Sequence, residues 1–205
     1  MSFLPELTDS HREVMKYIPL DIDGLLLVEP VVYSDDRGYF VETYRQADME
    51  QALGRTVSFV QENQSGSVYG VLRGIHLQLG EAAQAKLVRC VHGRIIDVVV
   101  DLRPESRYFG NHTSVELSAD NHRQLYIPRG FGHAFVALSS QVVFQYKVDN
   151  LYAPQSECCI RYDDPDLGIE WGRIAPELSS FLLSPKDLAG ISFREYRELY
   201  GSGKY

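Results

Sequence analysis

Short stretches of alternating apolar and polar residues dominate the middle of the chain, and they predict β-strands. They are rich in Val, Ile, Tyr and Phe and are bounded by turn signals such as Asp35-Asp36-Arg37-Gly38. Many short strands at this spacing favour an all-β sandwich or barrel over alternating strand–helix units. The expected strands are Leu25–Tyr33, Gly38–Tyr44, Val57–Asn63, Val68–Gln78, Ala85–His92, Arg94–Leu102, Thr113–Ser118, Gln124–Ile127, Ala134–Leu138, Val142–Val148 and Glu157–Tyr162.

Helical patterns are confined to the edges of this region. One covers Gln46–Leu53 and stops at Gly54, a residue that suits a helix C-cap. The other, Phe193–Tyr200, is short and amphipathic. Neither an internal repeat nor a linker is visible. We therefore expect one domain over residues 21–205 with a helical C-terminal tail, and a loosely attached N-terminal arm over residues 1–20.

The alternation also predicts which polar side chains point inward. Tyr146 lies on the apolar face of the expected strand Val142–Val148, and Lys86 likewise shares a face with apolar residues. Asp97 interrupts an otherwise apolar run. Because a buried charge is costly unless it is paired, Lys86 is a candidate site residue, and Asp97 needs an inward Lys or His as its partner.

Composition and charge narrow the classes of function. The 205 residues are 44% hydrophobic, and 20 Lys and Arg stand against 28 Asp and Glu, for a formal net charge of −8. Such an acidic chain is a poor ligand for nucleic acid or an anionic membrane. The N-terminal segment lacks the apolar stretch of a signal peptide, and apolar runs are too short to span a bilayer. We expect a soluble, cytoplasmic protein.

Metal chemistry has weak support in the sequence. The cysteines are odd in number and two are adjacent, which indicates buried free thiols rather than disulfides or a cysteine metal site: Cys90, Cys158 and Cys159. Two segments, one holding His76 and one ending at His133, resemble degraded cupin metal motifs. Gln78 stands where a metal-binding cupin has a second His. Because a catalytic metal usually takes three protein ligands, we expect a jelly-roll pocket without a metal.

A colinear series of motifs is more specific. It covers most of the chain: Asp36–Glu42, Phe59–Asn63, Val71–Gln78, Gln84–Arg89, Asp97–Arg103, Ser106–Gly110, Glu116–Ser118, Gln124–His133, Phe144–Lys147, Tyr152–Pro154, Asp164–Trp171 and Leu183–Asp187. Together these motifs resemble the dTDP-4-dehydrorhamnose 3,5-epimerase family, enzymes of L-rhamnose synthesis. The chain departs from the family pattern at Leu77, where an aromatic is usual, at Tyr126, where Trp is common, and at Arg129, where Glu is common.

The resemblance implies a cupin-type jelly-roll fold, a homodimer, no cofactor, and a dTDP-linked 4-keto-6-deoxyhexose as substrate. It makes His76 the general base, oriented by Asp187. Tyr146 becomes the acid on the opposite face of the sugar, and Lys86 neutralises the developing enolate. Positions that match binding of the nucleotide, the diphosphate or the sugar are Arg37, Glu42, Gln61, Asn63, Arg73, His133, Glu157 and Lys186. A dimer would also cover the edge strands of a sandwich.

The chemistry of epimerisation independently requires a base, a cation and a proton donor of these types. Inversion next to a ketone needs a base that titrates near neutral pH, a cation near the developing charge, and a proton donor across the ring. The expected reaction converts dTDP-4-dehydro-6-deoxy-D-glucose to dTDP-4-dehydro-L-rhamnose by inversion at C3 and C5. The alternatives are a single-centre epimerase of another deoxysugar pathway, a cupin ketoisomerase, and a non-catalytic sugar-nucleotide binding module.

Overall fold

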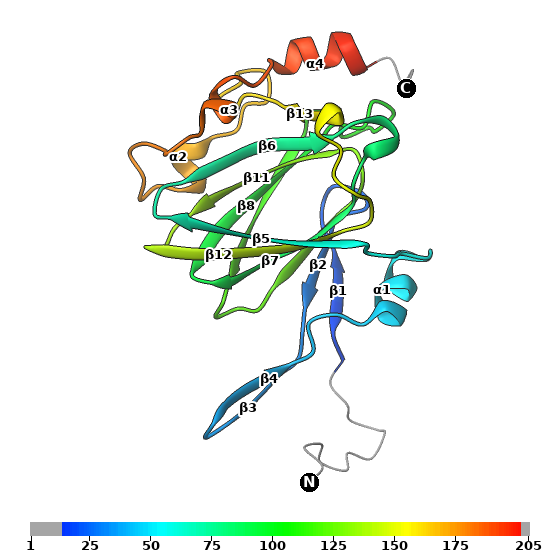
Figure 1. The fold of residues 1–205 in the computed structure, drawn as a ribbon, viewed down its shortest axis with the longest axis vertical. Helices are drawn as coiled ribbons and strands as arrows, with labels where there is room; N and C mark the ends of the chain where they lie inside the picture. The colour runs from blue at the N-terminus through cyan, green and yellow to red at the C-terminus, as the bar shows by residue number, and fades with distance from the viewer. Residues whose placement is uncertain (1–13, 202–205) are drawn as a thin grey trace.

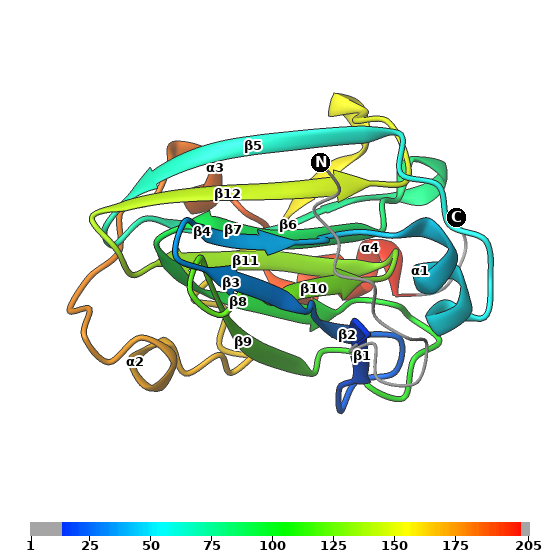
Figure 2. The same ribbon diagram turned by 90° about the horizontal axis from the view of Figure 1, so that it is seen from below.

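The computed structural model describes residues 14–201, and its strands form two antiparallel sheets stacked as a sandwich (Figures 1 and 2). In spatial order, the first sheet holds β1 (Lys16–Pro19), β2 (Leu26–Glu29), β10 (Gln124–Ile127), β7 (Lys86–His92), β12 (Gln141–Val148) and β5 (Gln61–Val68). The second holds β13 (Glu157–Cys159), β6 (Leu72–Gln78), β11 (Phe131–Ala137), β8 (Arg94–Asp101) and β9 (His112–Ser118). The expected all-β jelly-roll class is confirmed.

A separate hairpin, β3 (Val32–Asp35) with β4 (Gly38–Val41), projects from the body. Both expected helices are present, as α1 (Gln46–Leu53) and α4 (Phe193–Tyr200). Gly54 ends α1 with a φ of 63°, the left-handed conformation that suits glycine. The remaining short elements are η1 (Gly80–Ala82), η2 (Pro154–Ser156), α2 (Trp171–Ile174) and α3 (Pro185–Leu188). Within residues 14–201, no helix is long and apolar enough to cross a membrane.

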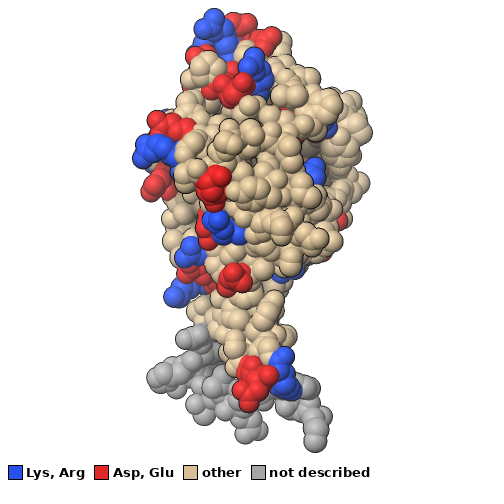
Figure 3. Space-filling view, turned by 90° about the vertical axis from the view of Figure 1, so that its left-hand side faces the viewer, with Lys and Arg blue, Asp and Glu red and all other residues tan. Residues whose placement is uncertain are grey.

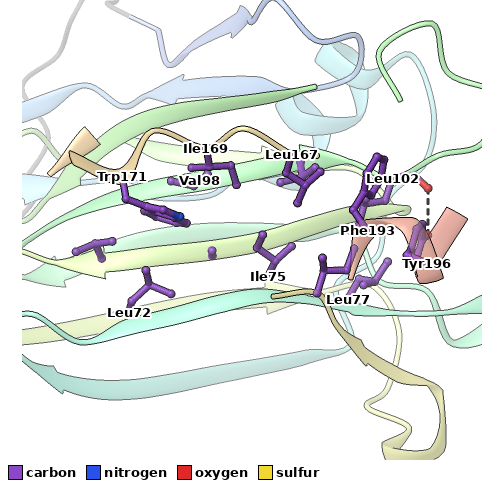
Figure 4. Close-up of a cluster of buried hydrophobic side chains, with 14 of the residues drawn as sticks. Leu72, Ile75, Leu77, Val98, Leu102, Leu167, Ile169, Trp171, Phe193 and Tyr196 are labelled. Atoms are coloured by element: carbon purple, nitrogen blue, oxygen red, sulfur yellow. Dashed lines mark hydrogen bonds between the residues drawn. The ribbon is translucent and has the colours of Figure 1, made fainter. Parts of the chain in front are cut away.

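Apolar side chains pack in three layers. Val88 and Phe144 of the first sheet meet Val99 and Phe135 of the second between the sheets. The C-terminal segment covers the outer face of the second sheet, where Trp171 and other large side chains pack (Figure 4). The outer face of the first sheet is covered around α1 by a cluster that includes Met49, Leu87 and Tyr126. Burial of these three layers stabilises the sandwich and leaves one polar region between the sheets.

Several strand boundaries differ from expectation. The expected strands Val57–Asn63 and Val68–Gln78 are wrong, because the polar run Gln61–Val68 forms one strand and pairs with β12 along its whole length. Gly70, with a φ of 80°, then turns the chain into the other sheet, where β6 begins. The expected strand Leu25–Tyr33 divides at Pro30, which has no N–H to donate to a ladder.

The expected N-terminal arm ends earlier than residue 20. Lys16–Pro19 is strand β1 and pairs with β2 at the edge of the first sheet. The rest of the arm, residues 1–13, lies outside the described residues. The division of the chain into an arm and a single domain therefore stays a prediction for those residues.

Candidate active site

A bulge in β6 brings two candidate site residues to one face. Arg73 and His76 are three residues apart, so simple alternation would place them on opposite faces. The register between β6 and β11 shifts, however, and inserts an extra residue at positions 74–75. Both side chains therefore point between the sheets, while Leu72 and Ile75 pack outward in the cluster of Figure 4. A Cβ on Gly74 would lie 2.7 Å from Leu72 Cδ2, so the bulge is packed around a glycine.

His76 and Asp187 form a hydrogen-bonded pair. His76 Nε2 lies 2.7 Å from Asp187 Oδ1, which also accepts the Gly74 N–H at 3.1 Å. Asp187 stands in the first turn of α3, and its other oxygen accepts the Ser184 hydroxyl in a capping box. The carboxylate is thus both the helix cap and the partner of the imidazole, and it is held rigidly from two sides.

The environment of this pair favours a neutral base and an ionised carboxylate. Burial lowers the pKa of His76, and the opposing effect of Asp187 does not restore it to its ordinary value. Burial acts to raise the pKa of Asp187, but hydrogen bonds from Ser184, Gly74 and His76 outweigh it and hold the pKa below its usual range. With Asp187 accepting from Nε2–H, the lone pair is on Nδ1, which has no hydrogen-bond partner among the described residues.

Tyr146 and Lys86 lie on the first sheet, across the space from His76. Tyr146 packs inward beside Phe144, as the alternation predicts. Burial raises the pKa of Tyr146 despite a hydrogen bond with Asn63 and the charge of Arg73, so the phenol is neutral. Burial lowers the pKa of Lys86 to about 8, against the opposing charges of Asp97 and Glu157.

Asp97 has the inward partner that its position demands. Its Oδ2 lies 2.7 Å from His133 Nε2, and the carboxylate is fully buried. His133 in turn stacks on Phe144, with ring centroids 5.7 Å apart. His133 also pairs with His76 in the β11–β6 register, so the two histidines are neighbours on one sheet. The His133–Asp97 pair therefore lies beside His76 and supports it.

Further polar side chains lie along the edge of the sandwich where β5 and β13 are the last strands of the two sheets, an edge called the opening below. Glu157 Oε1 is 2.5 Å from Lys186 Nζ, Oε2 accepts the Tyr152 hydroxyl at 2.5 Å, and His76 Nδ1 is 3.6 Å from Oε1. Burial acts to raise the pKa of Glu157, but those bonds hold it below its ordinary value. On the facing strand the Gln61 amide donates to Asn63, and Arg73 donates to Ser67 and the Gly66 carbonyl.

Two expected binding residues are not brought to this site within one chain. Arg37 lies at the tip of the β3–β4 hairpin, paired with Asp35, and Glu42 pairs with Arg45 at the start of α1. Figure 1 shows the hairpin at the opposite end of the molecule from α3 and β13, and α1 beside β1 and β2 at the lower side of the body. In Figure 3 the body narrows to a projection that ends in acidic and basic side chains. The other ten expected residues lie between the sheets or at their opening.

The three departures from the family pattern lie outside the site. Leu77 is buried in the cluster of Figure 4, on the other face of β6 from His76. Tyr126 is buried behind the first sheet and accepts a hydrogen bond from Arg55. Arg129 pairs with Asp149. None of these side chains therefore alters the chemistry of the pocket.

Some residues beside the candidate site were missed by the sequence interpretation. Ser184 was given no role of its own, although it stands three residues before Asp187 and forms a local capping box with it. Cys159 gave no usable signal, because it meets His76 only through the pairing of two distant strands. Cys159 lies directly opposite His76 in the β13–β6 register and is only half-buried, so the expectation that all three thiols are buried is wrong for this one. The Tyr152 hydroxyl donates to Glu157, which places this ring beside Lys186 as well.

Comparison with known proteins agrees with this geometry. A family model described as dTDP-4-dehydrorhamnose 3,5-epimerase matches residues 19–195. The epimerase of that name from Escherichia coli K12 is 50% identical over 173 residues, which cover 84% of this chain and 91% of the relative.

Two solved structures share the fold. An epimerase from Legionella pneumophila in complex with dTDP-4-keto-L-rhamnose has 43% identity and a TM-score of 0.82, with 88% of this chain and 93% of that chain covered. A 3′-monoepimerase from Streptomyces bikiniensis in complex with dTDP-quinovose has 36% identity and a TM-score of 0.83, with 89% and 90% covered. From the matching family model and the half-identical relative, the chain belongs to the dTDP-4-dehydrorhamnose 3,5-epimerase family.

Proposed function

We propose that this protein inverts both C3 and C5 of dTDP-4-dehydro-6-deoxy-D-glucose and so yields dTDP-4-dehydro-L-rhamnose. One observation carries the proposal: the base and the acid come from different sheets. His76, which Asp187 of α3 holds, lies on the second sheet, and Tyr146 lies on the first. A sugar ring held between the sheets therefore meets a proton acceptor on one face and a proton donor on the other.

The chemical steps follow from the protonation states. Neutral His76 removes the proton from the carbon next to the C4 ketone, and Asp187 stabilises the resulting imidazolium. The electron pair moves onto the ketone oxygen, where protonated Lys86 neutralises the enolate. Neutral Tyr146 returns a proton from the opposite face, which inverts the carbon. His76 then releases its proton to solvent and Tyr146 takes one from solvent, which restores both groups. The same sequence at the other carbon completes the reaction, and we propose that no cofactor takes part.

The opening between β5 and β13 supplies the binding groups. Arg73 and Lys186 are the cations that can meet a diphosphate through charge-assisted hydrogen bonds. Gln61 and Asn63 present amides along β5, and Glu157 holds Lys186 in place. His133 supports the floor through Asp97.

Two observations bear on whether the protein inverts one carbon or two. The same fold serves a 3′-monoepimerase, so geometry at this level allows both. Identity to the double epimerase of E. coli, at 50%, exceeds identity to the monoepimerase, at 36%, which favours two inversions. A purely binding role would not require a His–Asp pair opposite a neutral tyrosine.

We further propose that the protein acts as a homodimer in which the β3–β4 hairpin reaches the partner's site. Arg37 and Glu42 match substrate-binding positions, yet they lie away from His76 in their own chain. The hairpin carries Tyr39 and Phe40, each 62% exposed, and such rings are typical of protein interfaces. A second copy is the occupant that places Arg37 beside a diphosphate.

Deuterium incorporation tests the reaction. The protein is incubated with dTDP-4-keto-6-deoxyglucose in deuterium oxide, and mass spectrometry counts deuterons at C3 and C5. We expect two, while one indicates a single-centre epimerase and none contradicts the proposal.

His76→Ala is expected to lose exchange at both carbons by roughly 10²–10⁴-fold. Tyr146→Phe is expected to keep the deuterium exchange that His76 catalyses at the sugar carbons but to lose inversion. Full epimerase activity in this variant would exclude Tyr146 as the acid.

A further inference from the structure

Cys159 is a thiol beside the catalytic pair for which the proposed reaction has no use. Its Sγ, a ring nitrogen of His76 and a carboxylate oxygen of Asp187 all lie within 4.8 Å of one another. Within residues 14–201 this is the one such group of three ligand-bearing side chains. The three residues come from β13, β6 and α3, so only the fold assembles the group.

The spacing is close to that of a metal site. A tetrahedral zinc ion has ligand bonds of about 2.0 Å to nitrogen and oxygen and about 2.3 Å to sulfur, so these ligand atoms are about 3.3–3.6 Å apart. His76 Nε2 and Asp187 Oδ1, at 2.7 Å, need to separate slightly, and the sulfur needs to approach by about 1.3 Å at most. Side-chain rotation of that size is compatible with the half-buried positions of Cys159 and His76.

The surroundings of His76 also suit a metal ligand. A histidine that binds a metal through one nitrogen usually donates its other N–H to a carboxylate. Glu157 Oε1 lies 3.6 Å from Nδ1, and Nδ1 has no hydrogen-bond partner among the described residues. A carboxylate is therefore already in position to accept that proton once Nε2 is occupied.

We infer that His76, Cys159 and Asp187 form an inhibitory binding site for a thiophilic divalent cation such as Zn²⁺. On binding, the Cys159 thiol releases its proton to solvent and the sulfur bonds the metal. Nε2 of His76 bonds the metal, and its proton moves to Nδ1. The three protein ligands leave a fourth position for water.

This site opposes catalysis instead of assisting it. In the proposed reaction, which this inference takes as its basis, Nδ1 must be unprotonated in order to accept the substrate proton. The metal fixes a proton on that nitrogen and removes Asp187 from the ring. The enzyme is therefore expected to work without metal and to lose activity as Zn²⁺ binds, with recovery on chelation.

Cobalt provides a test that does not depend on activity. Metal-free protein is titrated with Co²⁺, and thiolate ligation is read from the near-ultraviolet charge-transfer absorption. Cys158 is the matched control, since it is the adjacent thiol but is buried in the apolar cluster with Leu77 and Ile160. We expect one equivalent of Co²⁺ to produce the absorption in wild type and in Cys158→Ala, and none in Cys159→Ala. Absence of the absorption in wild type, or its persistence in Cys159→Ala, overturns the site.

Zinc inhibition completes the experiment. Cys159→Ala is expected to keep its basal epimerase activity and to need at least about tenfold more Zn²⁺ for half-inhibition, because even an outer-shell partner contributes 10–100-fold to affinity. Equal sensitivity of wild type and Cys159→Ala would contradict the inhibitory role. If no epimerase activity is found in any variant, the proposed function fails, while the cobalt titration still decides whether the metal site exists.

Discussion

At the scale of single residues, we expect Lys86 to set the upper end of the working pH range. Its pKa is lowered to about 8 by burial, so its charge is present below that pH and is lost as the pH rises through it. The pKa of His76 is below its ordinary value of 6.5, so the base is neutral above that range. Plotted against pH, kcat/KM is expected to form a bell whose alkaline limb falls near pH 8.

The Lys86→Arg variant identifies the group behind that limb. Arginine keeps its charge well above pH 10, so the alkaline limb is expected to move up by more than one pH unit, with a lower maximum because the guanidinium has a different shape. Tyr146 has a raised pKa and would give a limb above pH 10 instead. An alkaline limb that stays near pH 8 in Lys86→Arg would assign it to another residue.

Inward-pointing residues were predictable one at a time where strands are regular. Alternation placed Tyr146 and Lys86 on inward faces, and the buried charge of Asp97 called for an inward Lys or His, which the structure supplies as His133. Alternation alone could not place Arg73 and His76 on one face, because the bulge that allows it depends on pairing with β11. The catalytic roles of these residues remain predictions from the family resemblance and the geometry.

At the scale of elements, the bulge in β6 is the most demanding local feature. In Gly74→Ala the added methyl meets Leu72 Cδ2 at 2.7 Å within the buried cluster. Overpacking of this kind costs about 1–3 kcal/mol of unfolding free energy, which urea denaturation measures. Activity is expected to fall more than stability predicts, since the same backbone donates to Asp187 and positions His76.

Gly172→Ala is the matched control for this change. A Cβ at Gly172, in α2, meets nothing within 4 Å, so the variant is expected to be neutral or more stable by about 0.5–1 kcal/mol. Its kcat is expected to equal that of wild type. If both alanine variants behave alike, the packing of the bulge does not control the position of the catalytic pair.

Strand boundaries were the least predictable feature of the fold, because they too depend on pairing with distant strands. The run Gln61–Val68 is mostly polar and reads as a loop, yet β12 pairs with it residue by residue. Its inward half faces the substrate space, so polar side chains stand where a core strand would have apolar ones. Local preference thus fails at the site itself, where chemistry and not burial determines the residue types.

At the scale of the whole molecule, one chain does not bring all the expected site residues together in one place. Pairing between chains leaves no periodic signal in the sequence, so only the resemblance and the need to cover sheet edges pointed to a dimer. The structure favours that expectation, because the β3–β4 hairpin, at whose turn Arg37 lies, projects away from β6, which carries His76 (Figure 1). In the proposed dimer, Arg37 therefore serves the site of the partner.

Mixing two inactive variants tests whether the hairpin serves the partner. In a heterodimer of Arg37→Glu and His76→Ala, the site of the Arg37→Glu chain has an intact base and receives Arg37 from the other chain. Equal mixing with random exchange makes half of the dimers mixed, each with one working site, so about a quarter of wild-type activity should return. His76→Ala mixed with Tyr146→Phe is the control, because both residues lie in the same chain's site and every site stays defective. Native mass spectrometry confirms that heterodimers have formed. If they form and the first mixture stays inactive, Arg37 does not act across the interface, and the hairpin's exposed rings need another explanation.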